Sequence, residues 1–324
     1  MSLRPAKYAA KSMVVALAAA AAAVVPAVSA TAAPAPVSGA HIVAHFDLAA
    51  GQQPENLTLE PDGSADVSLT TAHEIARVSP KGDVRILAVL PAPADGGVNT
   101  PLVGSARTFG IVRAANGTLF VLYNTGTADL TGVWRLRPGS HTPTRIAALP
   151  ADGLANGMAL DPHSGMLYIA DSVHGTVWQV PASGGTPKAF ASGGKLTSTP
   201  GAFGANGVKV HNGAVWVSSS QQGLLLRIPI EHCGTAGPMQ TKANVAGIDD
   251  FTFTGQGDTV LAAINGASQI ALVRPDGTQS IVLTMANGLQ NPTSMSVRGH
   301  TLYVASAAYS TQTDPNLLLA NLDR

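Results

Sequence analysis

Four oxygen-bearing side chains stand in matching positions along the chain, each just before an alternating apolar segment that ends in a glycine-containing turn. They are Glu55, Asn156, Asn206 and Asp249, in the phrases PENLTLEPDG, ANGMALDPHSG, ANGVKVHNGAVWV and IDDFTFTGQGD. All four are hard oxygen donors, and two are carboxylates. Such a set suits Ca²⁺, which takes about six to eight oxygen ligands, better than zinc. The pattern predicts a divalent metal site, with Ca²⁺ as the expected ion.

A simpler interpretation exists for two of these positions. Asn156-Gly157 and Asn206-Gly207 are Asn-Gly pairs, which are common in tight turns because both residue types tolerate positive φ. Glu55 and Asp249 occupy the same register and share no such turn preference. We therefore favour the metal interpretation.

Donors in separate segments meet at one ion only if the segments form a ring. The chain contains six repeated units of short alternating strands, whose first strands begin 43 to 54 residues apart. That spacing is close to the roughly 40–50 residues of a propeller blade. We predict an all-β fold, a six-bladed β-propeller with four strands per blade, over residues 41–324. The anchor positions of the six units are Glu55, Phe109, Asn156, Asn206, Asp249 and Thr293.

The two ends of the chain are expected to complete one blade together. The last unit, from Thr293, has room for about three strands before Arg324. The alternating stretch His41–Leu48 precedes the first unit and has none of its own. We predict that it pairs with the last blade, because closing the ring removes an exposed sheet edge.

The N-terminus has the features of a secretory signal peptide over residues 1–30. Arg4, Lys7 and Lys11 precede the uncharged apolar run Met13–Val25, and Val28-Ser29-Ala30 is a small-x-small cleavage signal. The run is shorter than the roughly 20 residues that span a bilayer. We expect residues 31–40 to be a flexible mature N-terminus and the protein to be secreted or extracytoplasmic, without a stable membrane span after cleavage. The alternative is an uncleaved alanine-rich anchor.

Composition excludes several classes of function. The formal net charge is zero, only 12% of residues are charged, and no basic run follows the N-terminus. Nucleic-acid binding needs clustered phosphate-neutralising cations, so we exclude it. Cys233 is the only cysteine, which excludes an intrachain disulfide and cysteine-based zinc sites. We expect a monomer that acts on a small molecule.

With these motifs the chain resembles the senescence-marker-protein, gluconolactonase and luciferin-regenerating family of six-bladed propellers. Members hold a divalent metal at the top of the channel through a Glu that opens the first blade and through Asn, Asn and Asp from later blades. The resemblance implies these roles for Glu55, Asn156, Asn206 and Asp249. It also implies a lactonase-type hydrolase.

The chain departs from that family around the substrate. The usual first-blade phrase Gly-Glu-Gly-Pro is replaced by Pro-Glu-Asn-Leu around Glu55. Phe109 stands where paraoxonase-like enzymes have a His, and Arg107 is not followed by the Asn of an Arg-x-Asn pair. These differences favour a substrate more apolar than a sugar lactone.

Further polar residues are expected at the same mouth, because the second strand of each blade returns to the rim where the first begins. We predict Asn124, Ser219, Asn265 and Phe109 as substrate-lining residues. The candidate proton-transfer residues are Asp249, Asp250, Asp171 and His174. For His174, the alternative is a solvated turn residue.

Two classes of function follow. The first is a secreted, metal-dependent hydrolase in which the ion polarises a lactone or ester carbonyl. The second is a non-catalytic ligand-binding or interaction propeller with a structural ion, since one fold hosts many functions. A metal-assisted isomerase or cyclase of small-molecule biosynthesis is a third possibility.

Overall fold

Short alternating segments separated by glycine turns fold here into strands, as expected. The computed structural model describes residues 1–2 and 36–323, so the predicted signal peptide lies outside the described residues, except for its first two. Helical structure in the described part is limited to three 3-10 turns, η1 (Gly194–Leu196), η2 (Asn265–Ala267) and η3 (Met285–Asn287). No helix in these ranges is long and apolar enough to cross a membrane.

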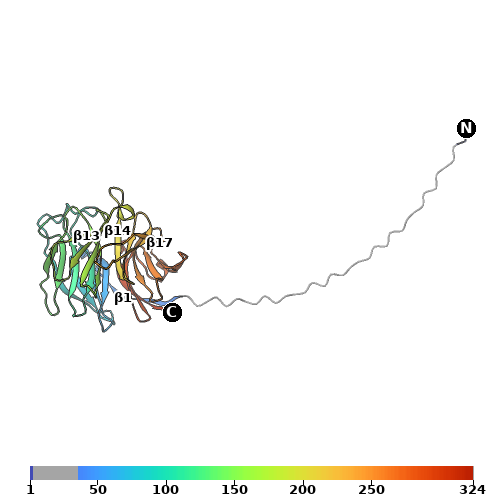
Figure 1. Ribbon diagram of the computed structural model, residues 1–324. Helices are drawn as coiled ribbons and strands as arrows, with labels where there is room; N and C mark the ends of the chain where they lie inside the picture. Colours follow the sequence, from blue (N-terminus) through green and yellow to red (C-terminus); the bar gives the residue numbers. More distant parts are fainter. Residues whose placement is uncertain (3–35, 324) are drawn as a thin grey trace. The chain divides into compact units, whose positions relative to one another are not determined.

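The strands form six antiparallel sheets of four, which we number as blades 1–6 in chain order (Figure 1). Blades 1–5 are each built from four consecutive strands. Their bounds are β2 (Pro54–Leu59), β3 (Ala65–Leu69), β4 (Glu74–Val78), β5 (Val84–Val89); β6 (Arg107–Arg113), β7 (Leu119–Asn124), β8 (Gly132–Leu136), β9 (Thr144–Ala148); β10 (Ala155–Asp161), β11 (Met166–Asp171), β12 (Thr176–Pro181), β13 (Lys188–Ser192); β14 (Ala205–His211), β15 (Ala214–Ser219), β16 (Leu224–Pro229), β17 (Gln240–Asn244); and β18 (Ile248–Phe253), β19 (Val260–Ile264), β20 (Gln269–Val273), β21 (Gln279–Leu283).

Blade 6 joins the two ends of the chain. Its strands β22 (Pro292–Arg298), β23 (Thr301–Ser306) and β24 (Asn316–Leu322) are followed at the outer edge by β1 (Val37–His45), which pairs antiparallel with β24 (Figure 1). The predicted ring closure by an N-terminal strand is confirmed. Its bounds were wrong, because the strand begins at Val37 and ends at His45 rather than running from His41 to Leu48. Residues 37–40 therefore belong to the propeller and not to a flexible N-terminus.

The hydrophobic core consists of six clusters, one between each pair of neighbouring blades. The cluster between the last and first blades joins Val67 and Leu69 to Tyr303 and Leu317. Because this pair packs like the other five, the ring is closed, and the predicted six-bladed β-propeller with four strands per blade is confirmed. Middle strands are covered on both faces, so that every residue of β15 is buried.

The first strand of each blade lies innermost. These strands contact one another in a ring that runs β2, β6, β10, β14, β18, β22 and back to β2. All six anchors sit at the beginning of these strands. The fold therefore brings residues from six distant parts of the chain to one end of a central channel.

Candidate metal centre

A β-bulge releases each anchor residue from the strand ladder. In all six innermost strands the register with the second strand breaks at the anchor, for example around Glu55 between Pro54 and Asn56 and around Asp249 between Ile248 and Phe251. The same break occurs around Phe109, Asn156, Asn206 and Thr293. Bulges re-aim side chains next to functional sites. Here five of the six anchor side chains face the open end of the channel, whereas Thr293 donates its hydroxyl to the Pro54 carbonyl at 2.9 Å.

The glycines after Asn156 and Asn206 do not form turns. Both Asn-Gly pairs lie within strands β10 and β14. A Cβ on Gly157 would come within 2.3 Å of the Asn206 carbonyl oxygen, and one on Gly207 within 2.2 Å of an Asp250 carboxylate oxygen. Glycine is required because neighbouring innermost strands approach closely at the axis. The turn interpretation of these pairs is therefore wrong.

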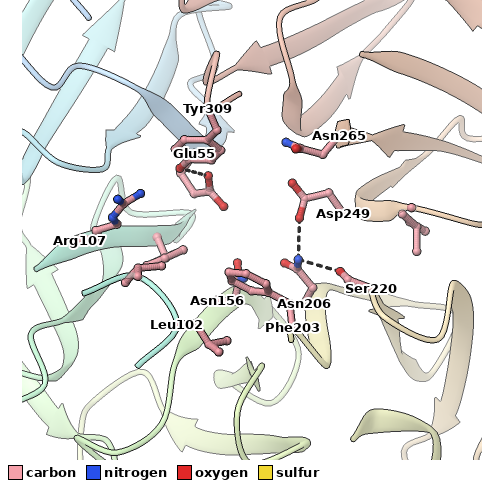
Figure 2. Close-up of a pocket in the computed structure, with 14 residues that line it drawn as sticks. Glu55, Leu102, Arg107, Asn156, Phe203, Asn206, Ser220, Asp249, Asn265 and Tyr309 are labelled. Carbon is pink, nitrogen blue, oxygen red and sulfur yellow. Dashed lines mark hydrogen bonds between the residues drawn. The ribbon is translucent and has the colours of Figure 1, made fainter. Parts of the chain in front are cut away.

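The four predicted metal ligands meet in one cavity at this end of the channel. Glu55, Asn156, Asn206 and Asp249 all line a cavity of about 510 Å³. In Figure 2 their polar ends surround a common open space, with Asn265 beside Asp249. Only two of the four are acidic, so this set is not a cluster of three or more His, Cys, Asp or Glu residues, and no such cluster that could hold a metal ion occurs among the described residues.

The hydrogen bonds of the two amides leave their oxygens to the cavity. Asn206 donates from Nδ2 to Asp249 Oδ1 at 2.6 Å and to Ser220 Oγ at 2.9 Å. Asn156 donates from Nδ2 to Ser172 Oγ at 3.3 Å. Since the nitrogens carry these bonds, the two amides present carbonyl oxygens, the donors that Ca²⁺ accepts.

The two carboxylates lie where negative charge is poorly compensated. Burial raises the pKa of Glu55 to about 7, against the opposing effects of a hydrogen bond from Tyr309 and the charge of Arg107. Burial, together with the charges of Glu55 and Asp250, holds the pKa of Asp249 well above its usual range. A bound cation would stabilise both carboxylates in their charged form. The donor types and the charge of the cavity thus fit a divalent metal ion.

One side of the cavity is apolar. Phe109, predicted to line the substrate site, does line it, together with the loop residues Leu102, Val103 and Phe203 and with Ile248. Figure 2 shows Leu102 and Phe203 on the side of Asn156 and Asn206. A ligand bound at the four oxygen donors would therefore rest part of its surface against hydrocarbon.

Three polar residues that line the cavity were not among the predicted site residues. Arg107 precedes Phe109 on β6 and donates from Nε to Ser105 Oγ at 3.1 Å. Tyr309, from the loop between β23 and β24, donates its hydroxyl to Glu55 Oε2 at 2.5 Å. Burial, followed by the charge of Glu55, holds the pKa of the Tyr309 phenol well above its usual range, so the hydroxyl stays protonated. The third is Ser220, which follows β15.

The structure does not place the Asp171–His174 pair in the cavity wall. Asp171 Oδ1 accepts the backbone N–H groups of Leu154, Val173 and His174, and Oδ2 accepts His174 Nδ1 at 2.9 Å and Trp178 Nε1 at 3.1 Å. The carboxylate, at the end of the second strand of blade 3, is engaged in binding a loop. The predicted proton-transfer role of these two residues has no geometric support.

Asp250, another predicted proton-transfer residue, faces away from the cavity. Both of its carboxylate oxygens accept from Lys209 Nζ, at 2.7 and 2.8 Å, and Oδ2 also accepts from Ser294 Oγ at 2.9 Å. Lys209 lies three residues beyond Asn206 on β14, toward the other end of the channel. Asp249 is thus the one predicted proton-transfer residue that lines the cavity.

Of the predicted lining residues at the second-strand ends, Asn265 lines the cavity and the other two do not. Asn124 exchanges two hydrogen bonds with the backbone of Ala155, at 2.8 and 2.9 Å, and so joins blade 2 to blade 3. Ser219 is fully buried in β15, and its neighbour Ser220 takes the cavity position. The prediction for blade 4 was therefore displaced by one residue.

Comparison with solved structures shows which known proteins share this fold. No protein-family model and no curated protein sequence matches the chain. Among solved structures, the chain is similar to the calcium-binding protein regucalcin from Agrobacterium tumefaciens, with 15% identity, a TM-score of 0.65, and coverage of 88% of this chain and 93% of that one. A luciferin-regenerating enzyme matches with 13% identity, a TM-score of 0.64, and coverage of 88% and 95%. Virginiamycin B lyase from Staphylococcus aureus, in a complex with quinupristin, matches with 15% identity, a TM-score of 0.57, and coverage of 84% and 82%. At these identities the likeness is one of fold, and that fold is the propeller of the proteins that the sequence motifs resemble.

Proposed function

We propose that this protein is an exported, divalent-metal-dependent hydrolase of lactones or esters that carry an apolar substituent. The observation that carries the proposal is the meeting of four hard oxygen donors, each released by a bulge, in one cavity with an apolar wall. The fold of regucalcin, a calcium-binding protein, and of a luciferin-regenerating enzyme supports a metal site and small-molecule chemistry in such a channel. We take Ca²⁺ as the expected ion.

The oxygen donors and the apolar wall have different parts in the proposed reaction. Glu55, Asn156, Asn206 and Asp249 would hold the ion, which when bound polarises the carbonyl and stabilises the developing oxyanion. No histidine is among the described residues that line this cavity, so we assign water activation to Asp249, the one predicted proton-transfer residue there. The apolar wall orients the substituent of the substrate and excludes water from one side of the reacting centre.

Removal and return of the metal tests this function. Protein treated with a chelator should lose hydrolysis across a panel of lactones and esters and regain it with Ca²⁺. Ca²⁺ at about 100 times its Kd should also add about 2.7 kcal/mol of stability, measured as a rise in melting temperature. A rise without any hydrolysis would favour a binding propeller or an isomerase, and the absence of both effects would refute the metal site.

The apolar wall predicts substrate preference. Phe203→Ala should raise KM for a lactone with a long alkyl substituent about 10-fold, because it removes hydrocarbon that such a substituent contacts. Steady-state kinetics across a series of chain lengths measures the effect. KM for an unsubstituted lactone should stay unchanged, as should all KM values in Phe253→Ala, which alters the other end of the channel. An equal rise in KM for short and long substrates would contradict the assignment of Phe203 to the wall that contacts the substituent.

A further inference from the structure

Tyr309 reaches the candidate metal centre from a loop that is built to present it. The loop between β23 and β24 contains three non-glycine residues with positive φ, Ala308 at 55°, Gln312 at 50° and Asp314 at 53°. Side chains rarely adopt this conformation, and such strain persists only where surrounding contacts enforce it. The loop conformation is therefore held by something other than its own preference.

Asn291 supplies that constraint. Its side chain is buried, and Oδ1 accepts the backbone N–H of Ser310 at 2.9 Å, the hydroxyl of Ser310 at 3.0 Å and the backbone N–H of Thr311 at 3.0 Å. These three bonds fix the two residues directly after Tyr309. On the cavity side, the guanidinium carbon of Arg107 lies 5.9 Å from the centre of the Tyr309 ring. The phenol is thus held between a pinned loop and a cation.

The hydroxyl of Tyr309 occupies one oxygen of Glu55. It donates to Oε2 at 2.5 Å, and Figure 2 shows this bond beside the open centre of the cavity. The other carboxylate is restricted in the same way, because Asp249 Oδ1 accepts from Asn206 at 2.6 Å. Each carboxylate therefore has one oxygen engaged by a neighbouring side chain and one oxygen left for a ligand.

We propose that Tyr309 is a positioning residue that keeps Glu55 a one-oxygen ligand and thereby limits the preference of the centre for Ca²⁺ over smaller ions. The inference rests on the proposed metal site. Ca²⁺ accommodates two-oxygen carboxylates and high coordination numbers, whereas Mg²⁺ demands six ligands and binds carboxylates through single oxygens. Releasing Oε2 of Glu55 should favour the larger ion.

Terbium(III), used as a luminescent stand-in for Ca²⁺, measures this directly. The difference between its emission lifetimes in H₂O and D₂O counts bound waters. With one oxygen from each of the four side chains and about eight positions in all, the wild-type protein should retain about four waters. Tyr309→Phe should retain about one fewer, because Glu55 then binds through both oxygens. It should also shift the ratio of Mg²⁺ to Ca²⁺ dissociation constants, from calorimetry, about 10-fold toward Ca²⁺.

Tyr303→Phe is the matched control. Tyr303 is in the same blade and donates its buried hydroxyl to the Gly63 carbonyl at 3.1 Å, away from the cavity. It should change neither the water count nor the ion ratio. If Tyr309→Phe behaves like Tyr303→Phe, or if the wild-type protein retains two waters or fewer, the positioning role is overturned while the metal site stands. If the wild-type protein binds no Tb³⁺ or Ca²⁺, the proposed function itself fails.

Discussion

Asp249→Asn is expected to lower both divalent-ion affinity and kcat/KM for hydrolysis by about 1,000-fold. Asp249 supplies one of the two carboxylates among the four donors, and it is the predicted proton-transfer residue that lines the cavity. Asparagine keeps the volume and one oxygen, so the substitution removes mainly the charge and the basic group. Calorimetry with Ca²⁺ and steady-state kinetics at saturating Ca²⁺ measure the two losses separately.

The melting temperature of the metal-free protein distinguishes a loss of metal binding in Asp249→Asn from misfolding. Burial and the charges of Glu55 and Asp250 disfavour the ionised form of Asp249, so a neutral side chain relieves repulsion in the metal-free protein. Metal-free Asp249→Asn should therefore melt no lower than the metal-free wild-type protein, and its melting temperature should not rise at the Ca²⁺ concentration that saturates the wild-type protein. Asp152→Asn makes the same change at a carboxylate that is 84% exposed and should behave like wild type. Wild-type Ca²⁺ affinity in Asp249→Asn would remove Asp249 from the ligand set.

The ring and its four oxygen donors were predictable because aligning the repeated units shows which residues occupy equivalent positions. Glu55, Asn156, Asn206 and Asp249 occur at the same point of repeated units, and a ring is the arrangement that brings such points together. The bulges at the anchors left no separate sequence signal. The glycines beside the two asparagines, taken alone, would have indicated turns, and only the packing of neighbouring strands explains them.

The residues around the donors were harder to predict for two physical reasons. Asn124 and Asp171 stand at the correct rim but one strand farther from the axis, about 4.8 Å out. There Asn124 bonds the backbone of the next blade, and Asp171 bonds backbone groups at the rim of its own blade. A polar residue that joins blades and one that faces a ligand look alike in sequence. Tyr309 lies in an irregular loop whose shape depends on Asn291, so no periodic pattern in the sequence indicates its position.

Lys209→Met is expected to lower the free energy of unfolding by about 3–5 kcal/mol, because it leaves the carboxylate of Asp250 buried without a counter-charge. The Asp250 side chain is 3% exposed, and Lys209 Nζ bonds both of its oxygens. In a domain of this size the melting temperature should fall by about 10 °C. Chemical denaturation followed by circular dichroism gives the free energy.

Asp250→Asn should lower the free energy of unfolding less than Lys209→Met does, and the double variant should recover much of the lost stability. Asp250→Asn leaves a lysine whose side chain is 24% exposed and can reach water, so its cost should be smaller than that of Lys209→Met. The double variant Lys209→Met/Asp250→Asn removes both charges and should recover most of the lost stability, since a buried pair is worth little beyond the penalty of breaking it. If the double variant is as unstable as Lys209→Met, the cation–π contact of Lys209 with the Phe251 ring, at 5.6 Å from Nζ, stabilises the channel rather than the ion pair with Asp250. Recovery would instead show that Asp250 is held in the channel by its counter-ion, which explains why it is unavailable to the cavity that Asp249 lines.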